Sequence, residues 1–130
     1  MKKNHGFTLI ELMIVLVILG LLASLVAPEM FSKVSSTKRK TATAQMQMFQ
    51  TALDTYRLDV GSYPNELSEL IKSDKRNWDG PYLPKSVPQD PWGYSYQYKL
   101  INNGISFEMF SYGNDGQTGG EGENADITHQ

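Results

Sequence analysis

Cysteine is absent from this sequence of 130 residues, so no disulfide can stabilise the fold in any redox compartment. Once a strongly apolar N-terminal stretch is set aside, about 100 residues remain for a globular part, and a domain of that size buries only a modest core. Such a domain gains stability from a further cross-link. Without cysteine, that cross-link is a bound metal or association with other subunits.

The residues that common enzyme classes require are also scarce. The two histidines, His5 and His129, lie near opposite ends of the chain, and no Gly-Lys-Ser/Thr phosphate loop occurs. Residues 120–125 match the spacing of a dinucleotide fingerprint, but no helix can follow them, and Glu121 and Glu123 would repel a pyrophosphate. With no cysteine nucleophile and no histidine pair, the sequence predicts that the protein is not an enzyme.

Basic residues are missing from the C-terminal part of the chain. The net charge of −2 does not suggest a nucleic-acid partner, but the charges are unevenly spread, and the last Lys or Arg is Lys99. The charged residues beyond it are all acidic: Glu108, Asp115, Glu121, Glu123 and Asp126. This composition suits a solvated tail or a site for a hard cation.

The N-terminal part is dominated by the apolar stretch FTLIELMIVLVILGLLASLVA, residues 7–27. As a helix it spans roughly 32 Å, about the thickness of a bilayer hydrocarbon core. A cleaved secretory signal has a shorter apolar region and a small-x-small cleavage site, which Leu25-Val26-Ala27 before Pro28 does not provide. The stretch is therefore predicted to be a transmembrane anchor.

Glu11 is the one ionisable residue in this stretch. A carboxylate in a membrane is costly and indicates a function with a specific partner. No Lys or Arg lies between Lys3 and Lys33, so no side-chain cation within the anchor can pair with it. Cleavage between Gly6 and Phe7 would instead create a free α-amine four residues before Glu11.

The residues Gly6-Phe7-Thr8-Leu9-Ile10-Glu11, followed by an apolar helix and Pro28, resemble the class III signal of type IV pilins and type II pseudopilins. The resemblance implies that a prepilin peptidase cuts after Gly6, removes residues 1–6 as a leader and methylates Phe7. It also implies that Glu11 pairs with an N-terminal amine, usually of a neighbouring subunit, during assembly. The alternative is an ordinary anchor with a stray glutamate.

An apolar stripe continues the helical pattern beyond Pro28. Its members recur at spacings of three and four: Ala42, Met46, Phe49, Leu53, Tyr56 and Val60. Gly61 is a plausible C-cap and Pro64 prevents further helix. The pattern predicts a nearly continuous helix, of which residues 7–28 form the transmembrane or filament-core half, followed by a domain of residues 29–130.

Two segments with alternating side chains follow the loop-rich region 61–92. Residues 94–100 and 105–109 flank the turn sequence Asn102-Asn103-Gly104, which predicts a β-hairpin. Trp92 and the tyrosines are interpreted as core and turn anchors. The predicted fold is α+β and type IV pilin-like: a long N-terminal transmembrane helix packed on a small antiparallel β-sheet, with a C-terminal loop.

The C-terminal half resembles a narrower family, the major pseudopilins of type II secretion systems (general secretion pathway protein G). The resemblance is carried by residues 88–93 (PQDPWG), 96–98 (YQY), 110–117 (FSYGNDGQ) and 119–127 (GGEGENADI). It is weakest between Asn65 and Asp79, and the last three residues lack the tryptophan that the family leads us to expect.

The acidic loop is a candidate calcium site. Asp115 and Asp126 have the spacing of the first and last residues of an EF-hand loop, but two expected acids are missing and no helix can follow, which excludes an EF-hand. A glycine-rich loop with carboxylates can still bind Ca²⁺. The family resemblance implies ligands from the side chains of Asp115, Asp126 and Asn124 and the carbonyls of Tyr112 and Gln117. The alternative is an ordinary Asn-Asp-Gly turn followed by a flexible acidic tail.

The resemblance as a whole implies a structural subunit of the periplasmic pseudopilus, a helical homopolymer that helps to export folded proteins across the outer membrane. The implied partners are further copies of the chain, minor pseudopilins, the prepilin peptidase, an inner-membrane assembly platform and a cytoplasmic ATPase. The implied location is a single pass through the inner membrane of a Gram-negative bacterium, with the C-terminal domain in the periplasm.

Both the orientation and the function have alternatives. The positive-inside rule favours the opposite orientation, because four basic residues follow the apolar stretch: Lys33, Lys38, Arg39 and Lys40. The alternative functions are a type IV pilus major pilin, used in adhesion or motility, and a membrane-tethered calcium-binding module without a filament role.

Overall fold

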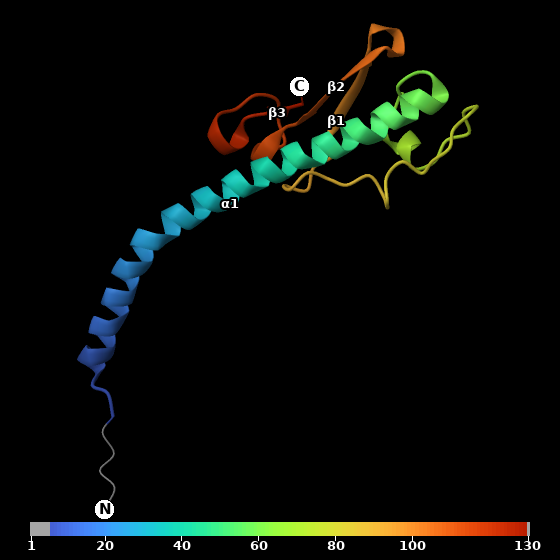
Figure 1. Ribbon diagram of the computed structural model, residues 1–130. Coiled ribbons are helices and arrows are strands. Elements are labelled where there is room, and N and C mark those ends of the chain that lie inside the picture. The colour runs from blue at the N-terminus through green and yellow to red at the C-terminus, as the bar shows by residue number, and fades with distance from the viewer. Residues whose placement is uncertain (1–5, 130) are drawn as a thin grey trace, which may run out of the picture. The chain divides into compact units, whose positions relative to one another are not determined.

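The structure, a computed structural model, describes residues 6–129 (Figure 1). The predicted leader therefore lies outside the described residues except for Gly6. The chain forms two compact units, residues up to Ser36 and residues from Thr37 onward. Helix α1 (Leu9–Val60) belongs to both, and the second unit adds β1 (Gln97–Ile101), β2 (Ser106–Ser111) and β3 (Ile127–Thr128). Four short 3₁₀ helices complete it: η1 (Leu67–Leu70), η2 (Asn102–Gly104), η3 (Gly113–Asp115) and η4 (Gly122–Asn124).

The first unit is the N-terminal part of α1, which continues without interruption through Pro28. The large apolar side chains from Leu9 to Val34 are exposed along this whole part of the helix. Among the described residues, α1 is the one helix that is long and apolar enough to cross a membrane. An apolar surface of this extent belongs against lipid or against other protein chains.

The second unit contains the hydrophobic core, and the stripe that the sequence predicts along α1 forms one side of it. Ala42, Met46, Phe49, Leu53 and Tyr56 are buried, whereas Val60 is half-buried and packs against the core. The opposite side of the core is built from later segments: Leu70, Leu83, Tyr96, Met109 and Ile127. The rings of Phe49 and Tyr96 meet edge to face at a centroid distance of 5.3 Å, a favourable aromatic geometry.

The sheet confirms the predicted hairpin and adds a third strand. β1 pairs antiparallel with β2, with Leu100 opposite Phe107, and η2 makes the turn, where Asn102 and Asn103 adopt the left-handed backbone that asparagine tolerates. The sequence did not predict β3, which pairs with β2 through Phe110 and Ser111 and has only two residues. Figure 1 shows these strands beside the part of α1 that belongs to the second unit.

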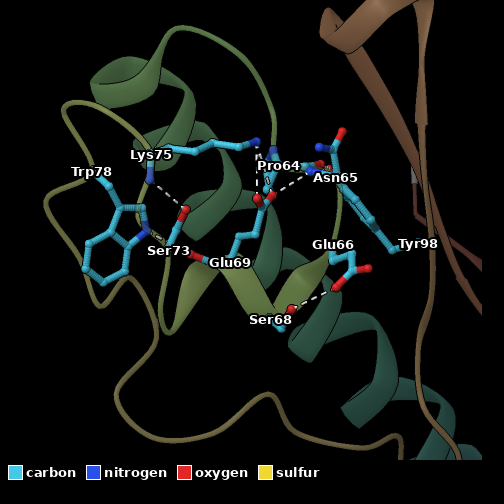
Figure 2. Close-up of polar contacts among 9 residues, drawn as sticks. All are labelled: Pro64, Asn65, Glu66, Ser68, Glu69, Ser73, Lys75, Trp78 and Tyr98. Atoms are coloured by element: carbon cyan, nitrogen blue, oxygen red, sulfur yellow. Dashed lines mark hydrogen bonds and ion pairs between the residues drawn. The ribbon is translucent and has the colours of Figure 1, made fainter.

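The segment after α1 is held by a polar cluster around Glu69 (Figure 2). The Glu69 carboxylate accepts a hydrogen bond from the Asn65 backbone N–H at 2.7 Å and pairs with the Lys75 ammonium at 3.2 Å. Burial alone would lower the pKa of Lys75, but the hydrogen bond and negative charge of Glu69 outweigh it, and the pKa is raised. The hydroxyl of Tyr98 donates to the Pro64 carbonyl at 2.6 Å, so β1 is tied to the same segment.

Candidate functional site

The first candidate site is the start of α1. Gly6 and Phe7 lie in exposed, non-helical backbone just before the helix, and the Phe7 side chain is 90% exposed. Glu11 lies in the first turn, where it forms a reciprocal capping box with Thr8. The Thr8 backbone N–H donates to Glu11 Oε2 at 3.2 Å, and the Glu11 backbone N–H donates to Thr8 Oγ1 at 3.2 Å.

The capping box gives the Glu11 carboxylate a partner within its own chain. A negative charge in the first turn also interacts favourably with the helix dipole. The capping role of Thr8 was not predicted, although the spacing Thr-x-x-Glu before an apolar run is the recognised signal for this motif. The Gly6–Phe7 bond, the Phe7 nitrogen and the Glu11 carboxylate therefore lie close together in the sequence, at the junction between exposed backbone and an apolar helix.

The second candidate site is the loop of residues 112–126, which leaves β2 and returns into β3. The pairing of Ser111 with Ile127 closes the base of this loop. Its two arms touch at glycines: a Cβ on Gly113 would lie 2.8 Å from the Ala125 carbonyl oxygen, and a Cβ on Gly120 would lie 2.6 Å from that of Asn124. Both glycines have positive φ, so the close approach of the arms depends on glycine at these positions.

The structure places the five predicted calcium ligands on these two arms. Tyr112, Asp115 and Gln117 belong to the outgoing arm and Asn124 and Asp126 to the returning arm. Asp115 Oδ1 accepts a hydrogen bond from the Gln117 backbone N–H at 3.1 Å, within its own arm. The arms are joined by a bond from Asn114 Nδ2 to Asn124 Oδ1 at 3.3 Å and by one from the Gly119 N–H to Asp126 Oδ2 at 3.1 Å.

The surroundings of the Asp126 carboxylate bear most directly on whether the loop can bind a metal. Its Oδ1 atom is buried and has no hydrogen-bond partner, whereas Oδ2 is satisfied by Gly119. A buried carboxylate oxygen without a donor is costly, and a bound cation is one way to satisfy it. No group of three or more His, Cys, Asp or Glu side chains suited to a metal occurs within residues 6–129. The predicted ligand set contains only two carboxylates, and its other donors are one side-chain amide and two backbone carbonyls. All five donors are oxygen atoms, which fit the chemistry of Ca²⁺.

Arg39 attaches the returning arm of the loop to α1. Its Nη1 atom donates to the carbonyl of Gly122 at 3.2 Å and to that of Ala125 at 3.0 Å. These two carbonyls belong to the first residue of η4 and to the residue that follows η4, and Ala125 lies between Asn124 and Asp126. In the sequence, Arg39 is only one of the basic residues after the apolar stretch, because nothing in its local pattern indicates a partner more than 80 residues away.

A buried acid supports the outgoing arm. Asp90 is 4% exposed, and its Oδ1 accepts hydrogen bonds from the backbone N–H groups of Trp92 at 3.1 Å and Tyr94 at 2.8 Å. Its Oδ2 accepts from the hydroxyl of Ser111, which is fully buried, at 2.7 Å. Burial, followed by the negative charge of Asp90, raises the pKa of Tyr96. In the sequence, Asp90 stands out only as one residue of the segment 88–93 that carries the family resemblance.

Comparisons with known proteins cover both candidate sites. A family model for the prokaryotic N-terminal methylation motif matches residues 1–27, and a model for type II secretion system protein G matches residues 29–130. The type II secretion system core protein G of Pseudomonas aeruginosa is 39% identical over 134 residues, covering 97% of this chain and 94% of the relative. The protein of the same name from Vibrio cholerae is 40% identical, covering 98% and 92%.

A solved structure shares the fold. The crystal structure of the major pseudopilin from the type 2 secretion system of enterohaemorrhagic Escherichia coli matches with a TM-score of 0.61 and 28% identity, covering 75% of this chain and 90% of that one. An apolar N-terminal helix with a methylation motif, joined to this small antiparallel domain, defines the pilin-like class of subunits. Within that class, the chain belongs to the type II secretion system protein G family.

Proposed function

We propose that this chain is the major structural subunit of a type II secretion pseudopilus, and that it has no catalytic role. The observation that carries the proposal is the pairing of two matches on one chain, the methylation motif over residues 1–27 and the protein G model over residues 29–130. The unpartnered apolar part of α1 supports it, because a helix of this kind can exchange lipid for the helices of neighbouring copies.

The proposed pathway assigns a role to each end of the chain. The prepilin peptidase cuts between Gly6 and Phe7 and methylates Phe7, and the chain rests in the inner membrane of a Gram-negative cell with residues 29–130 in the periplasm. An assembly platform, a cytoplasmic ATPase and minor pseudopilins then act on it. Glu11 pairs with an α-amine, usually of a neighbouring copy, and registers the incoming helix. Growth of the homopolymer helps to move folded proteins across the outer membrane.

Deletion of the gene tests the proposed role in secretion. The expected result is that exported proteins accumulate in the periplasm and fall at least about tenfold in the culture medium, because the filament cannot form. Complementation with the intact gene should restore export. Normal export together with loss of surface fibres would identify a type IV pilin instead, and normal export with intact fibres would indicate a tethered module.

We further propose that the loop of residues 112–126 binds Ca²⁺. The side chains of Asp115, Asn124 and Asp126 and the carbonyls of Tyr112 and Gln117 would hold the ion, which supplies a cross-link between the two arms. The buried, unpartnered Oδ1 of Asp126 supports this proposal. A cation that binds only the folded domain also offers the stabilisation that a cysteine-free chain lacks.

Thermal unfolding of the full chain in detergent micelles tests the calcium site. Calcium at about one hundred times its Kd adds about 2.7 kcal/mol to the free energy of unfolding, which raises the Tm of a domain of this size by roughly 10–20 °C. Asp126→Asn should remove most of that rise, whereas Glu123→Gln, which removes one charge from an exposed residue of the same loop, should retain it. Equal Tm values in calcium and in chelator would contradict the proposal.

A further inference from the structure

A chain of hydrogen bonds runs from the turn of residues 90–94 into the loop of residues 112–126. Asp90 Oδ2 accepts from the Ser111 hydroxyl at 2.7 Å, and Ser111 Oγ in turn accepts from the backbone N–H of Gly113 at 3.2 Å. Asp90, Ser111 and Gly113 are all buried. We call this chain of bonds the Asp90 relay.

The Asp90 relay is rigid at its origin. The second oxygen of Asp90 accepts from the N–H groups of Trp92 and Tyr94, and the Asp90 N–H donates to the Tyr94 carbonyl at 2.8 Å. All three donors to the carboxylate are thus fixed by a tight turn or by β2. Hydrogen bonds to a charged acceptor are the stronger kind, and breaking one partner of a buried set leaves the other unsatisfied.

The relay ends on the peptide group that carries a proposed calcium ligand. The N–H of Gly113 and the carbonyl of Tyr112 belong to one planar peptide unit, in which the two groups point in opposite directions. Fixing the direction of the Gly113 N–H therefore fixes the direction of the Tyr112 carbonyl. Gly113 has φ +77°, and because glycine has no Cβ it adopts negative φ about as readily, so this peptide plane can take other orientations unless it is held.

A second contact joins the same turn to the same arm of the loop. The ring of Tyr94 packs on the backbone of Gly116, so closely that a Cβ at that position would lie 2.6 Å from Tyr94 Cζ. The turn is therefore linked to both ends of the segment from Gly113 to Gly116. The link to Gly113 runs through Ser111, and the link to Gly116 is the ring of Tyr94. Asp115, whose side chain is another proposed ligand, lies within that segment.

From this geometry we infer that Asp90 and Ser111 are positioning residues, which hold the Tyr112 carbonyl and the outgoing arm in the arrangement that binds calcium. Neither residue is itself a ligand. The inference rests on the proposed calcium site and adds to it the part of the domain that prepares the loop before the ion arrives. Pre-organisation of this kind raises affinity because less ordering of the loop is left to the binding step.

Calcium titration of the full chain in detergent micelles tests the inference, by calorimetry at a temperature where every variant is folded. Asp90→Asn and Ser111→Ala are each expected to raise the Kd for Ca²⁺ about tenfold or more. Tyr98→Phe is the matched control, because it removes a partly buried hydrogen bond of 2.6 Å elsewhere in the same domain. It should lower the Tm but leave the Kd unchanged.

The outcomes separate this inference from the calcium proposal. If Asp90→Asn and Ser111→Ala lower the Tm but bind calcium with the wild-type Kd, the two residues are merely structural and the inference is overturned. If the wild-type chain binds no calcium, the calcium proposal fails by itself. In that case, amide hydrogen exchange in the calcium-free protein tests the inference. Faster exchange at Gly113 and Gln117 in Ser111→Ala than in the wild type would support positioning of the loop, and unchanged exchange would overturn the inference.

Discussion

Replacement of Glu11 by glutamine is expected to leave the chain cleaved and inserted in the membrane but unable to form filaments. Glutamine can still accept the hydrogen bond from the Thr8 N–H, so the capping box and the start of α1 are retained while the charge is lost. The loss of one charge-assisted hydrogen bond weakens each subunit addition by about 1.5–3 kcal/mol, or roughly ten- to one-hundredfold. Because every addition is affected, filaments should fall below detection.

The measurement combines two assays on the same cells. Gel mobility and mass spectrometry of the N-terminus report cleavage and methylation at Phe7, and shearing or cross-linking reports filaments. Glu29→Gln is the matched control, since it removes the same charge from the same helix face about five turns further along. Wild-type filament levels in Glu11→Gln would show that the carboxylate has no role in registration.

Replacement of Gly120 by alanine is expected to abolish most of the calcium-dependent rise in Tm, whereas Gly119→Ala should preserve it. Both glycines have positive φ, +100° at Gly120 and +81° at Gly119, so each substitution costs about 1–2 kcal/mol in backbone strain. They differ in the space around them. A Cβ at Gly120 would lie 2.6 Å from the carbonyl oxygen of Asn124, whereas a Cβ at Gly119 meets nothing within 4 Å.

The atom that Gly120→Ala would displace is backbone, which cannot swing aside as a flexible side chain can. The returning arm must therefore move as a whole, and Asn124 and Asp126 move with it. Melting curves of both variants are measured with calcium and with chelator. The backbone strain lowers the Tm of both variants, whereas movement of the returning arm reduces the calcium-dependent rise in Tm of Gly120→Ala alone. Equal calcium responses in the two variants would mean that the approach of Gly120 to Asn124 has no part in metal binding.

The parts of the fold that could be predicted are those with a strong local period. The α1 stripe is visible because Met46, Phe49 and Leu53 repeat at helical spacing, and the hairpin is visible because two alternating segments flank an Asn-Asn-Gly turn. Strand β3 has only two residues, too few to show a period, and forms because β2 offers a free edge for it to pair with.

The residues that support the loop of residues 112–126 were harder to predict, for different reasons. Ser111 follows Phe107 and Met109 in the alternation of β2, so its position on the buried face could have been anticipated, and a buried hydroxyl requires a partner. The identity of that partner could not be anticipated, because Asp90 lies 21 residues away, before the β1–β2 hairpin. Arg39 is a harder case, since its bonds to Gly122 and Ala125 exist only once α1 and the loop have come together.

Among residues 6–129, every buried core residue lies in the stretch from Ala42 to Ile127, and none lies in the exposed apolar part of α1. The surface suited to lipid and the core that is shielded from water therefore belong to separate stretches of one polypeptide. In the proposed assembly, moving the apolar helix out of lipid would disturb no packing inside the hydrophobic core, so only the helix would change its surroundings. If the proposed function is right, a motor that pulls such a subunit could transport the domain fully folded, and the exposed helix would replace its contacts with lipid by contacts with the helices of copies already assembled.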